Sequence, residues 1–220
     1  MDASFEPAKK PEDVKKLIEE FLHDKMAHDY VIARSKEYDG YRKDLLENKS
    51  LYENDPDKFQ EFLHPLRSGE TAVRDNRFGN RINTSEKVNA LIEAITSETF
   101  EDAVEKTYSL EGIGMDLLTT LMHIMNREKF HCLNGRTVKS IKILMDERFL
   151  PRQKLNNYLT AKTTSGLRGY IKTYTDYVGV MDQLQEAGGM TKTETDYFMA
   201  WLDKDMRAKY NMGDSRKWGY

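Results

Sequence analysis

The sequence predicts an all-α protein, a compact multi-helix domain, on three observations. Apolar residues recur three and four positions apart along most of the chain, which places them on one face of a helix. Several of these segments begin with Ser or Thr before acidic residues, and some end at Gly, as helix starts and ends do. The apolar-polar alternation of strands is scarce, and "YVIA" at 30–33 is the one β-branched cluster.

The N-terminal part predicts helices followed by a loop. Residues 11–48, "PEDVKK…LLEN", have helical spacing and start at Pro11, since proline suits a first helical turn. The stretch "DPDKFQEFLHPL" predicts a short helix that stops near Pro65. The stretch "RSGETAVRDNRFGNR", residues 67–81, predicts a long loop broken by glycines. We therefore expect an N-terminal helical region, 1–82, with an exposed loop, and a helical domain, 83–220, or one continuous domain.

The C-terminal part predicts a series of capped helices. "NTSEKVNALIEAI" begins with a Ser/Thr cap, and we expect Ser97 to cap the helix in "SETFEDAVEKTYSL". Further helices are expected over about 136–149, around Leu155 to Leu159, over "SGLRGYIKTYTDYVGVMDQLQEAGGM" with its Ala-Gly-Gly end, and over "TKTETDYFMAWLDKDMRAKY".

Composition excludes several classes of protein. Hydrophobic residues make up 39% and charged residues 32%, which is enough for a core and argues against disorder. No run of about 18 apolar residues predicts a membrane span, and residues 1–16 lack the apolar part of a signal peptide. Cys132 is the only cysteine, so no internal disulfide or cysteine-based zinc site can form. His23 and His28, five apart, are poorly spaced for a shared metal. We expect a cytoplasmic protein with no metal, no cofactor and no membrane partner.

Charge is concentrated in one part of the chain. Residues 127–172 hold eleven Lys/Arg and three acids, a net charge of +8, whereas the whole chain carries −3 and the remainder −11. Such polarisation can form a face for a polyanion, and it is equally what solvated helix faces produce.

A Gly-Ile-Gly turn, Gly112 to Gly114, separates two predicted helices in "SLEGIGMDLLTTLMHI". Glycines let another molecule approach the main chain, and the N–H groups from Met115 onward start the second helix. A helix start of this kind binds a phosphate well, without reading base sequence. The alternative is a plain corner in a helical bundle.

Two segments together resemble the helix–hairpin–helix DNA glycosylase superfamily of endonuclease-III-like folds. "SLEGIGMDLLTTLMHI" is similar to its Leu-Pro-Gly-Val-Gly hairpin and following helix, and "FHCLNGRTV" to the element that carries its catalytic aspartate. The 22-residue spacing from Gly112 to Asn134 also matches that family. The similarity covers 97–150, about a quarter of the chain, and implies a helix–hairpin–helix motif within the all-α domain.

Two departures from the family bear on chemistry. Asp116 stands where the bifunctional enzymes have a nucleophilic lysine, and Asn134 aligns with the aspartate. An amide neither accepts a proton usefully nor stabilises a cationic sugar. No set of cysteines supplies an iron–sulfur cluster. The resemblance thus implies the non-enzymatic form of the module, which occurs alone or within DNA-processing and modification-dependent restriction systems.

We therefore expect a DNA-binding protein that holds the phosphate backbone without base specificity and has no catalytic residue, Asp116 being the one weak candidate. The expected DNA-binding residues are Gly112, Ile113, Gly114, Met115, Arg127, Lys129, Asn134, Arg136 and Lys139. One alternative is an active base-excision glycosylase or lyase that uses Asp116. Another is a helical module that binds a protein partner or a second copy of itself.

Two further patterns leave alternatives open. His123, His131 and Cys132 suggest either a Cys–His nucleophile or a buried thiol among core histidines. Tyr170, Tyr174 and Tyr177 beside Arg168 and Lys172 suggest stacking on unpaired bases, or packing of one helix face into the core.

Overall fold

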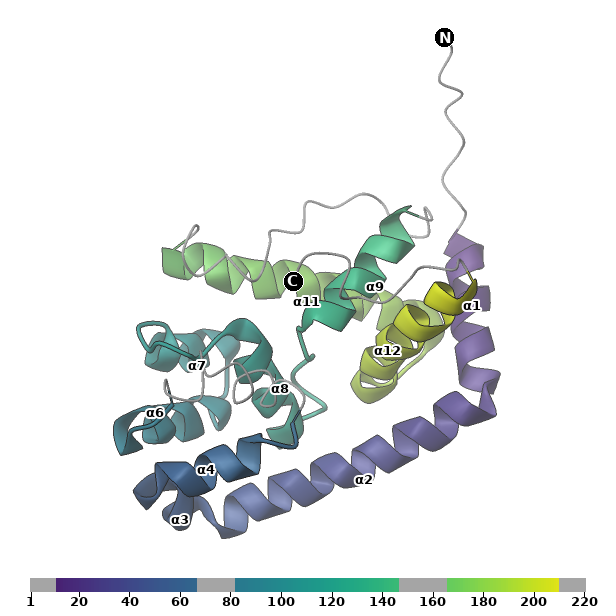
Figure 1. Cartoon of the computed structure of the whole chain (residues 1–220). Helices are drawn as coiled ribbons and strands as arrows, with labels where there is room; N and C mark the ends of the chain where they lie inside the picture. The colour runs from purple at the N-terminus through teal and green to yellow at the C-terminus, as the bar shows by residue number, and fades with distance from the viewer. Residues whose placement is uncertain (1–10, 67–81, 147–165, 210–220) are drawn as a thin grey trace.

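The computed structural model describes residues 11–66, 82–146 and 166–209, and all regular structure in these ranges is α-helical, as predicted (Figure 1). None of the helices described is long and apolar enough to cross a membrane. The helices are α1 (Pro11–His23), α2 (Lys25–Glu47), α3 (Lys49–Asn54), α4 (Pro56–Leu63), α6 (Ser85–Ile95), α7 (Phe100–Thr107), α8 (Met115–Met125), α9 (Gly135–Asp146), α11 (Gly166–Gly188) and α12 (Lys192–Lys209).

The predicted N-terminal helical segment divides at Asp24 into α1 and the long α2. The Asp24 carboxylate accepts hydrogen bonds from the N–H groups of Met26 and Ala27 and so caps α2. Its other oxygen accepts from Trp201 Nε1 at 2.9 Å. The same carboxylate thus caps α2 and joins it to α12.

The short helix before Pro65 is confirmed as α4, which ends at Leu63. Asp55 caps it and Pro56 occupies its first turn. The Phe59 ring packs against Tyr52 of α3 at 5.7 Å, so this helix pair is held by aromatic contacts.

The cap of α7 was predicted wrongly. Thr99 accepts from the N–H of Asp102 at 3.1 Å and is the N-cap. Ser97 instead donates to the carbonyl of Glu93 at 3.1 Å, at the end of α6. Thr99, which lies three residues before Asp102, therefore caps the helix with the spacing that is usual for N-terminal caps.

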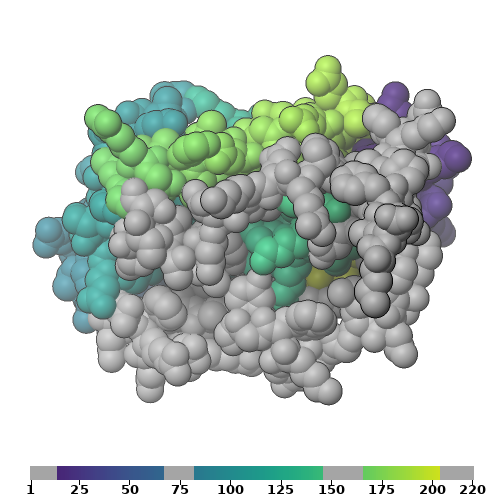
Figure 2. Space-filling model, turned by 90° about the horizontal axis from the view of Figure 1, so that it is seen from above, coloured from purple at the N-terminus to yellow at the C-terminus, as the bar shows by residue number. Residues whose placement is uncertain are grey.

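The two long C-terminal helices end and begin as predicted. Gly189 has a φ of 61°, and the N–H of Met190 donates to the carbonyl of Gln185, which closes α11. Thr191 and Glu194 exchange hydrogen bonds in a capping box that starts α12. On the face of the molecule in Figure 2, α11 extends from the α6–α7 side to α1.

The tyrosines of α11 pack into the core. Tyr170, Tyr174 and Tyr177 are all buried, and the ring of Tyr174 stacks on Phe100 of α7 at 4.0 Å. Packing, the second of the two alternatives, is the one observed.

One buried apolar cluster extends from Val14 to Leu202 and receives side chains from both sides of residue 82. A division at residue 82 stays a prediction. The predicted loop 67–81 and the predicted helical segment near Leu155 to Leu159 lie outside the described residues.

Candidate functional site at the starts of α8 and α9

The turn between α7 and α8 directs its apolar side chains inward and its glycine backbone outward. Ile113 and Met115 are each 3% exposed, whereas Gly114 is exposed. Gly112 has a φ of 92°, a conformation that side chains disfavour. Gly114 is the N-cap of α8 and has no side chain with which to cap it. A Cβ at Gly114 would meet no atom within 4 Å, so the space there is open.

Asp116 and Asn134 belong to one small polar cluster, in which Thr120 and Cys132 link them. Thr120 donates to Asp116 Oδ1 at 3.5 Å, and its Oγ1 also lies 3.1 Å from Cys132 Sγ. The side-chain amide of Asn134 donates to the same sulfur at 3.2 Å. We name this set, Asp116, Thr120, Cys132 and Asn134, the polar cluster. It joins the first two turns of α8 to the start of α9.

Asn134 has a structural task as the N-cap of α9. Its Oδ1 accepts from the N–H groups of Arg136 at 2.9 Å and Thr137 at 3.1 Å. Thr137 accepts in return from the N–H of Asn134 at 3.0 Å. The amide nitrogen and the oxygen of the Asn134 side chain are thus both hydrogen-bonded within the protein.

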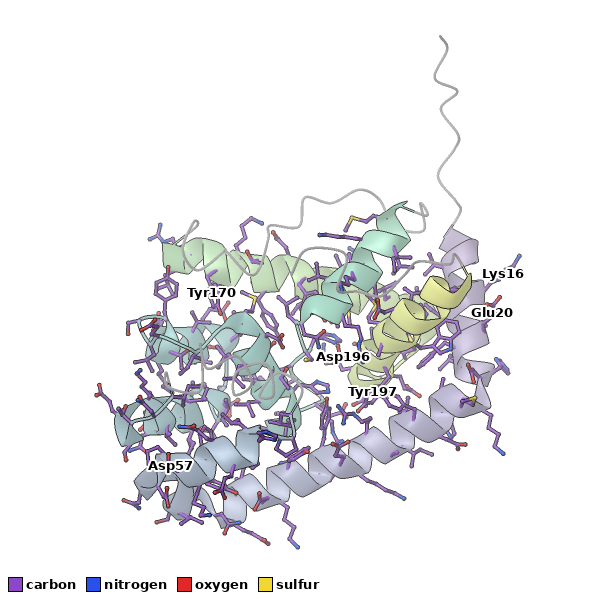
Figure 3. All side chains as sticks on the ribbon, viewed as in Figure 1. Lys16, Glu20, Asp57, Tyr170, Asp196 and Tyr197 are labelled. Carbon is purple, nitrogen blue, oxygen red and sulfur yellow. The ribbon has the colours of Figure 1, made fainter. Side chains whose placement is uncertain are left out.

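Asp196 of α12 holds the segment before Asn134 in place. Its carboxylate lies 3.2 Å from His123 Nδ1 and 3.4 Å from His131 Nδ1, and it accepts from the N–H of Cys132 at 3.3 Å. All four of these residues are buried. Figure 3 marks Asp196 at the end of α12 that faces α2.

The carbonyls of the same segment are paired by tyrosines of α11. Tyr174 donates to the carbonyl of His131 at 3.0 Å, and Tyr177 to that of Cys132 at 2.7 Å. Because side chains satisfy the backbone here, a non-helical segment can lie inside the core. The position of Asn134 is therefore set by α11 and α12.

Sequence reasoning missed Asp196 and Lys192. Asp196 is an acid one turn before Met199 on the buried face of α12, and an acid on an apolar face needs a partner. That signal was available in the sequence. Lys192, which donates to Asp182 at 2.9 Å and lies 3.2 Å from His131 Nε2, has no comparable sequence signal.

Cys132 is a buried thiol with a raised pKa. Desolvation, followed by the charges of Asp196 and Asp116, raises the pKa of Cys132 to about 12. The thiol is therefore protonated at neutral pH and is not an activated nucleophile. Of the two alternatives for this residue, burial in the core is the one observed.

Acidic side chains lie beside three of the cations expected at a DNA surface, Arg127, Lys129 and Arg136. Arg127 pairs with Asp39 and also donates to the carbonyl of Ser35 at 2.7 Å. Lys129 lies 2.6 Å from a carboxylate oxygen of Glu98, and Arg136 lies 4.0 Å from one of Asp203. The fourth, Lys139, is half-buried on α9. Arg127 and Lys129 lie in the turn that follows α8, at the opposite end of that helix from Gly114, and Arg136 and Lys139 lie on α9.

Within the described ranges, no group of three or more His, Cys, Asp or Glu side chains is placed to hold a metal ion. Comparison with family models, with curated proteins and with solved structures finds no match to this chain. The resemblance to the glycosylase superfamily therefore stays a prediction.

Proposed function

We propose that the chain binds DNA through the phosphate backbone, as a helix–hairpin–helix protein without glycosylase chemistry. The observation that supports this most is the start of α8. Gly112 turns the chain with a φ of 92°, and Gly114 stands at the N-cap with open space around it. In this proposal α7, the turn and α8 form the helix–hairpin–helix motif.

A phosphate suits this helix start for a physical reason. A Ser or Asp at an N-cap offers its own oxygen to the N–H groups of the first turn, and glycine does not. A phosphate oxygen outside the protein is then an acceptor of the right charge for the positive end of the helix. Since the contact is made to main-chain N–H groups, it carries no base specificity.

Asp116 in the first turn of α8 works against this contact, because its charge repels a phosphate. Its Oδ1 accepts from Thr120, one turn further along the helix, at 3.5 Å. We expect the affinity of the turn to be moderate for that reason. Four positive side chains add to the attraction for phosphate through their electric field. They are Arg127, Lys129, Arg136 and Lys139.

The contacts within the polar cluster favour a binding role for the chain over a catalytic one. Asn134 uses its amide and its oxygen within the protein, and the raised pKa of Cys132 keeps that thiol protonated. Asp116 is the only carboxylate in the cluster, and no lysine belongs to it. These groups supply neither the amine nucleophile nor the aspartate of the bifunctional enzymes.

Titration of labelled duplex and abasic-site DNA at two salt concentrations, with a strand-cleavage readout, tests the proposal. We expect salt-sensitive binding of both DNAs without cleavage. Gly114→Glu places a carboxylate in the open space at the turn and abolishes binding. Gly40→Glu is the matched control, since a Cβ at Gly40 on α2 would also meet no atom within 4 Å.

Two results would overturn the proposal. Base release or nicking that is lost in Asp116→Asn would establish the base-excision alternative. Absence of binding to either DNA at low salt would leave the helical assembly module.

A further inference from the structure

Four side chains meet where α2 faces α12, away from the α7–α8 turn. Tyr30, Arg34 and Tyr38 lie four residues apart along one stripe of α2, and Tyr197 of α12 faces them. The rings of Tyr30 and Tyr197 are 5.7 Å apart, and the Arg34 guanidinium carbon lies 5.3 Å from the centroid of the Tyr38 ring. We name this set the tyrosine–arginine cluster. Figure 3 labels Tyr197 at the end of α12 nearest to α2.

Two polar atoms of this cluster are buried and have no hydrogen-bond partner in the part of the chain that the structure describes. They are the hydroxyl of Tyr197, a residue only 6% exposed, and Nε of Arg34. Buried polar groups in folded proteins nearly always have a partner. Two such groups on facing helices suit a shared partner that is not among the residues the structure describes.

The Nε–H of Arg34 can only donate and the Tyr197 hydroxyl can donate or accept, while both oxygens of the neighbouring Glu37 carboxylate are already used. Arg34 Nη1 donates to Glu37 at 2.5 Å, and the other oxygen of Glu37 accepts from Tyr41 at 3.3 Å. Arginine has five N–H donors and no acceptor, and its Nε edge is one that binds an oxyanion by a fork. The missing partner is therefore an acceptor.

A second guanidinium lies in the same region. Arg127 donates to the carbonyl of Ser35, the neighbour of Arg34 on α2. Both Arg34 and Arg127 act electrostatically on the Tyr197 hydroxyl, as do the hydroxyls of Tyr38 and Tyr30. Burial, followed by Tyr38, raises the pKa of Tyr197 while the two arginines act in the opposite direction, so the Tyr197 hydroxyl keeps its proton and can donate it.

We propose that the tyrosine–arginine cluster binds a phosphate group, held by Arg34 Nε and the Tyr197 hydroxyl. Each arginine is paired with one carboxylate, Arg34 with Glu37 and Arg127 with Asp39, so the empty cluster is close to neutral. Hydrogen-bond geometry therefore decides the affinity more than net charge does. Inorganic phosphate will be preferred over chloride at equal ionic strength.

The test is the melting temperature of the full chain in rising inorganic phosphate, with NaCl keeping the ionic strength constant. A ligand that binds the folded state raises the melting temperature in a saturable way. We expect such a rise for the wild type, and its loss in Tyr197→Phe. We also expect Arg34→Lys, which keeps the charge and removes the fork, to weaken phosphate binding about tenfold.

Two controls separate binding from folding. Without phosphate, Tyr197→Phe will melt no lower than the wild type, because it removes a buried hydroxyl that has no partner. Tyr177→Phe removes a hydroxyl that donates to Cys132 at 2.7 Å, so it will melt lower and keep the phosphate response. Arg42→Lys, on the exposed side of α2, will keep the response as well.

The proposal is overturned if phosphate gives no more stabilisation than NaCl, or if Tyr197→Phe keeps the full response. If the melting experiment supports the proposal, the DNA affinity of Tyr197→Phe identifies the source of the phosphate group. A loss of affinity identifies a backbone phosphodiester, and an unchanged affinity identifies a small phosphorylated molecule. The melting experiment contains no DNA, so its result is independent of the proposed DNA contact at Gly114.

Discussion

The side-chain amide of Asn134 donates a hydrogen bond to Cys132 Sγ at 3.2 Å, while its oxygen caps α9. Asn134 thus connects a buried thiol to a helix start. Both contacts are structural, and they account for an asparagine at this position without reference to catalysis.

Replacing Asn134 by alanine removes both contacts. Loss of an N-cap costs about 1 kcal/mol of unfolding free energy, and we expect Asn134→Ala to lose about that much in urea unfolding. Asn134→Asp keeps the capping oxygen and should lose less. Asn83→Ala, at an exposed position, is the control and should change stability by less than about 0.5 kcal/mol. Equal stability of Asn134→Ala and the wild type would contradict the capping role.

Under the proposed resemblance to the glycosylase superfamily, an aspartate at position 134 should not by itself produce strand cleavage. Asn134→Asp still lacks the lysine, since Asp116 stands in its place. We expect no strand cleavage of abasic-site DNA by this variant in a gel assay. Cleavage above the wild-type background would show that the cluster is a functional active site with one residue missing.

Asp196 should be among the most important polar residues for stability. Asp196→Ala leaves His131 Nδ1 and the N–H of Cys132 without their acceptor inside the core. Unpaired buried groups of this kind cost about 3 kcal/mol together. Asp29→Ala, exposed on α2, serves as the matched control and should be nearly neutral. A loss below about 1 kcal/mol for Asp196→Ala would argue against the network described here.

Cys132 should react slowly with iodoacetamide in the folded protein. With a pKa of about 12, only about one thiol in a thousand is ionised at pH 9, whereas a thiol with the ordinary pKa of 9.0 is half ionised. The unfolded chain in urea should therefore be alkylated far faster. Because Cys132 is the only cysteine, the rate reports this site alone. Equal rates in the two states would contradict its burial.

The raised pKa of Cys132 also makes the free energy of unfolding depend on pH. The folded thiol keeps its proton up to about pH 12, and the unfolded thiol releases it above about pH 9. Rising pH therefore favours unfolding, by about 1.4 kcal/mol per pH unit between these values. Buried tyrosines, such as Tyr170, shift in the same direction. Cys132→Ala isolates the thiol, and it should show a shallower loss of stability over this range.

Local patterns predicted the helices well and the long-range contacts poorly. Helical spacing identified α4, α6, α11 and α12, because each buries one face and carries its own caps. Helical spacing did not reveal the break at Asp24, where a local cap is joined by a hydrogen bond from Trp201, 177 residues further along the chain. Thr99 stands three residues before Asp102, a spacing that favours it as the cap over Ser97, which bonds the end of α6 instead.

The candidate site shows the same contrast. The turn at Gly112 to Gly114 was visible as a pair of glycines between two apolar segments. The polar cluster was not, because Thr120 and Cys132 carry no signal until α8 and the segment before α9 pack together. Asp196 and the tyrosines of α11 reach that segment from 43 to 65 residues away, through contacts that spacing alone does not encode.

The central claim, a phosphate grip at the start of α8, is tested most directly by the salt dependence of DNA affinity in Gly114→Ser. Serine supplies its own cap to α8, so this variant should fold at least as stably as the wild type. The account predicts weaker duplex binding at low salt and a smaller slope of log affinity against log salt, because one phosphate contact is lost. An affinity and a slope equal to those of the wild type would contradict it.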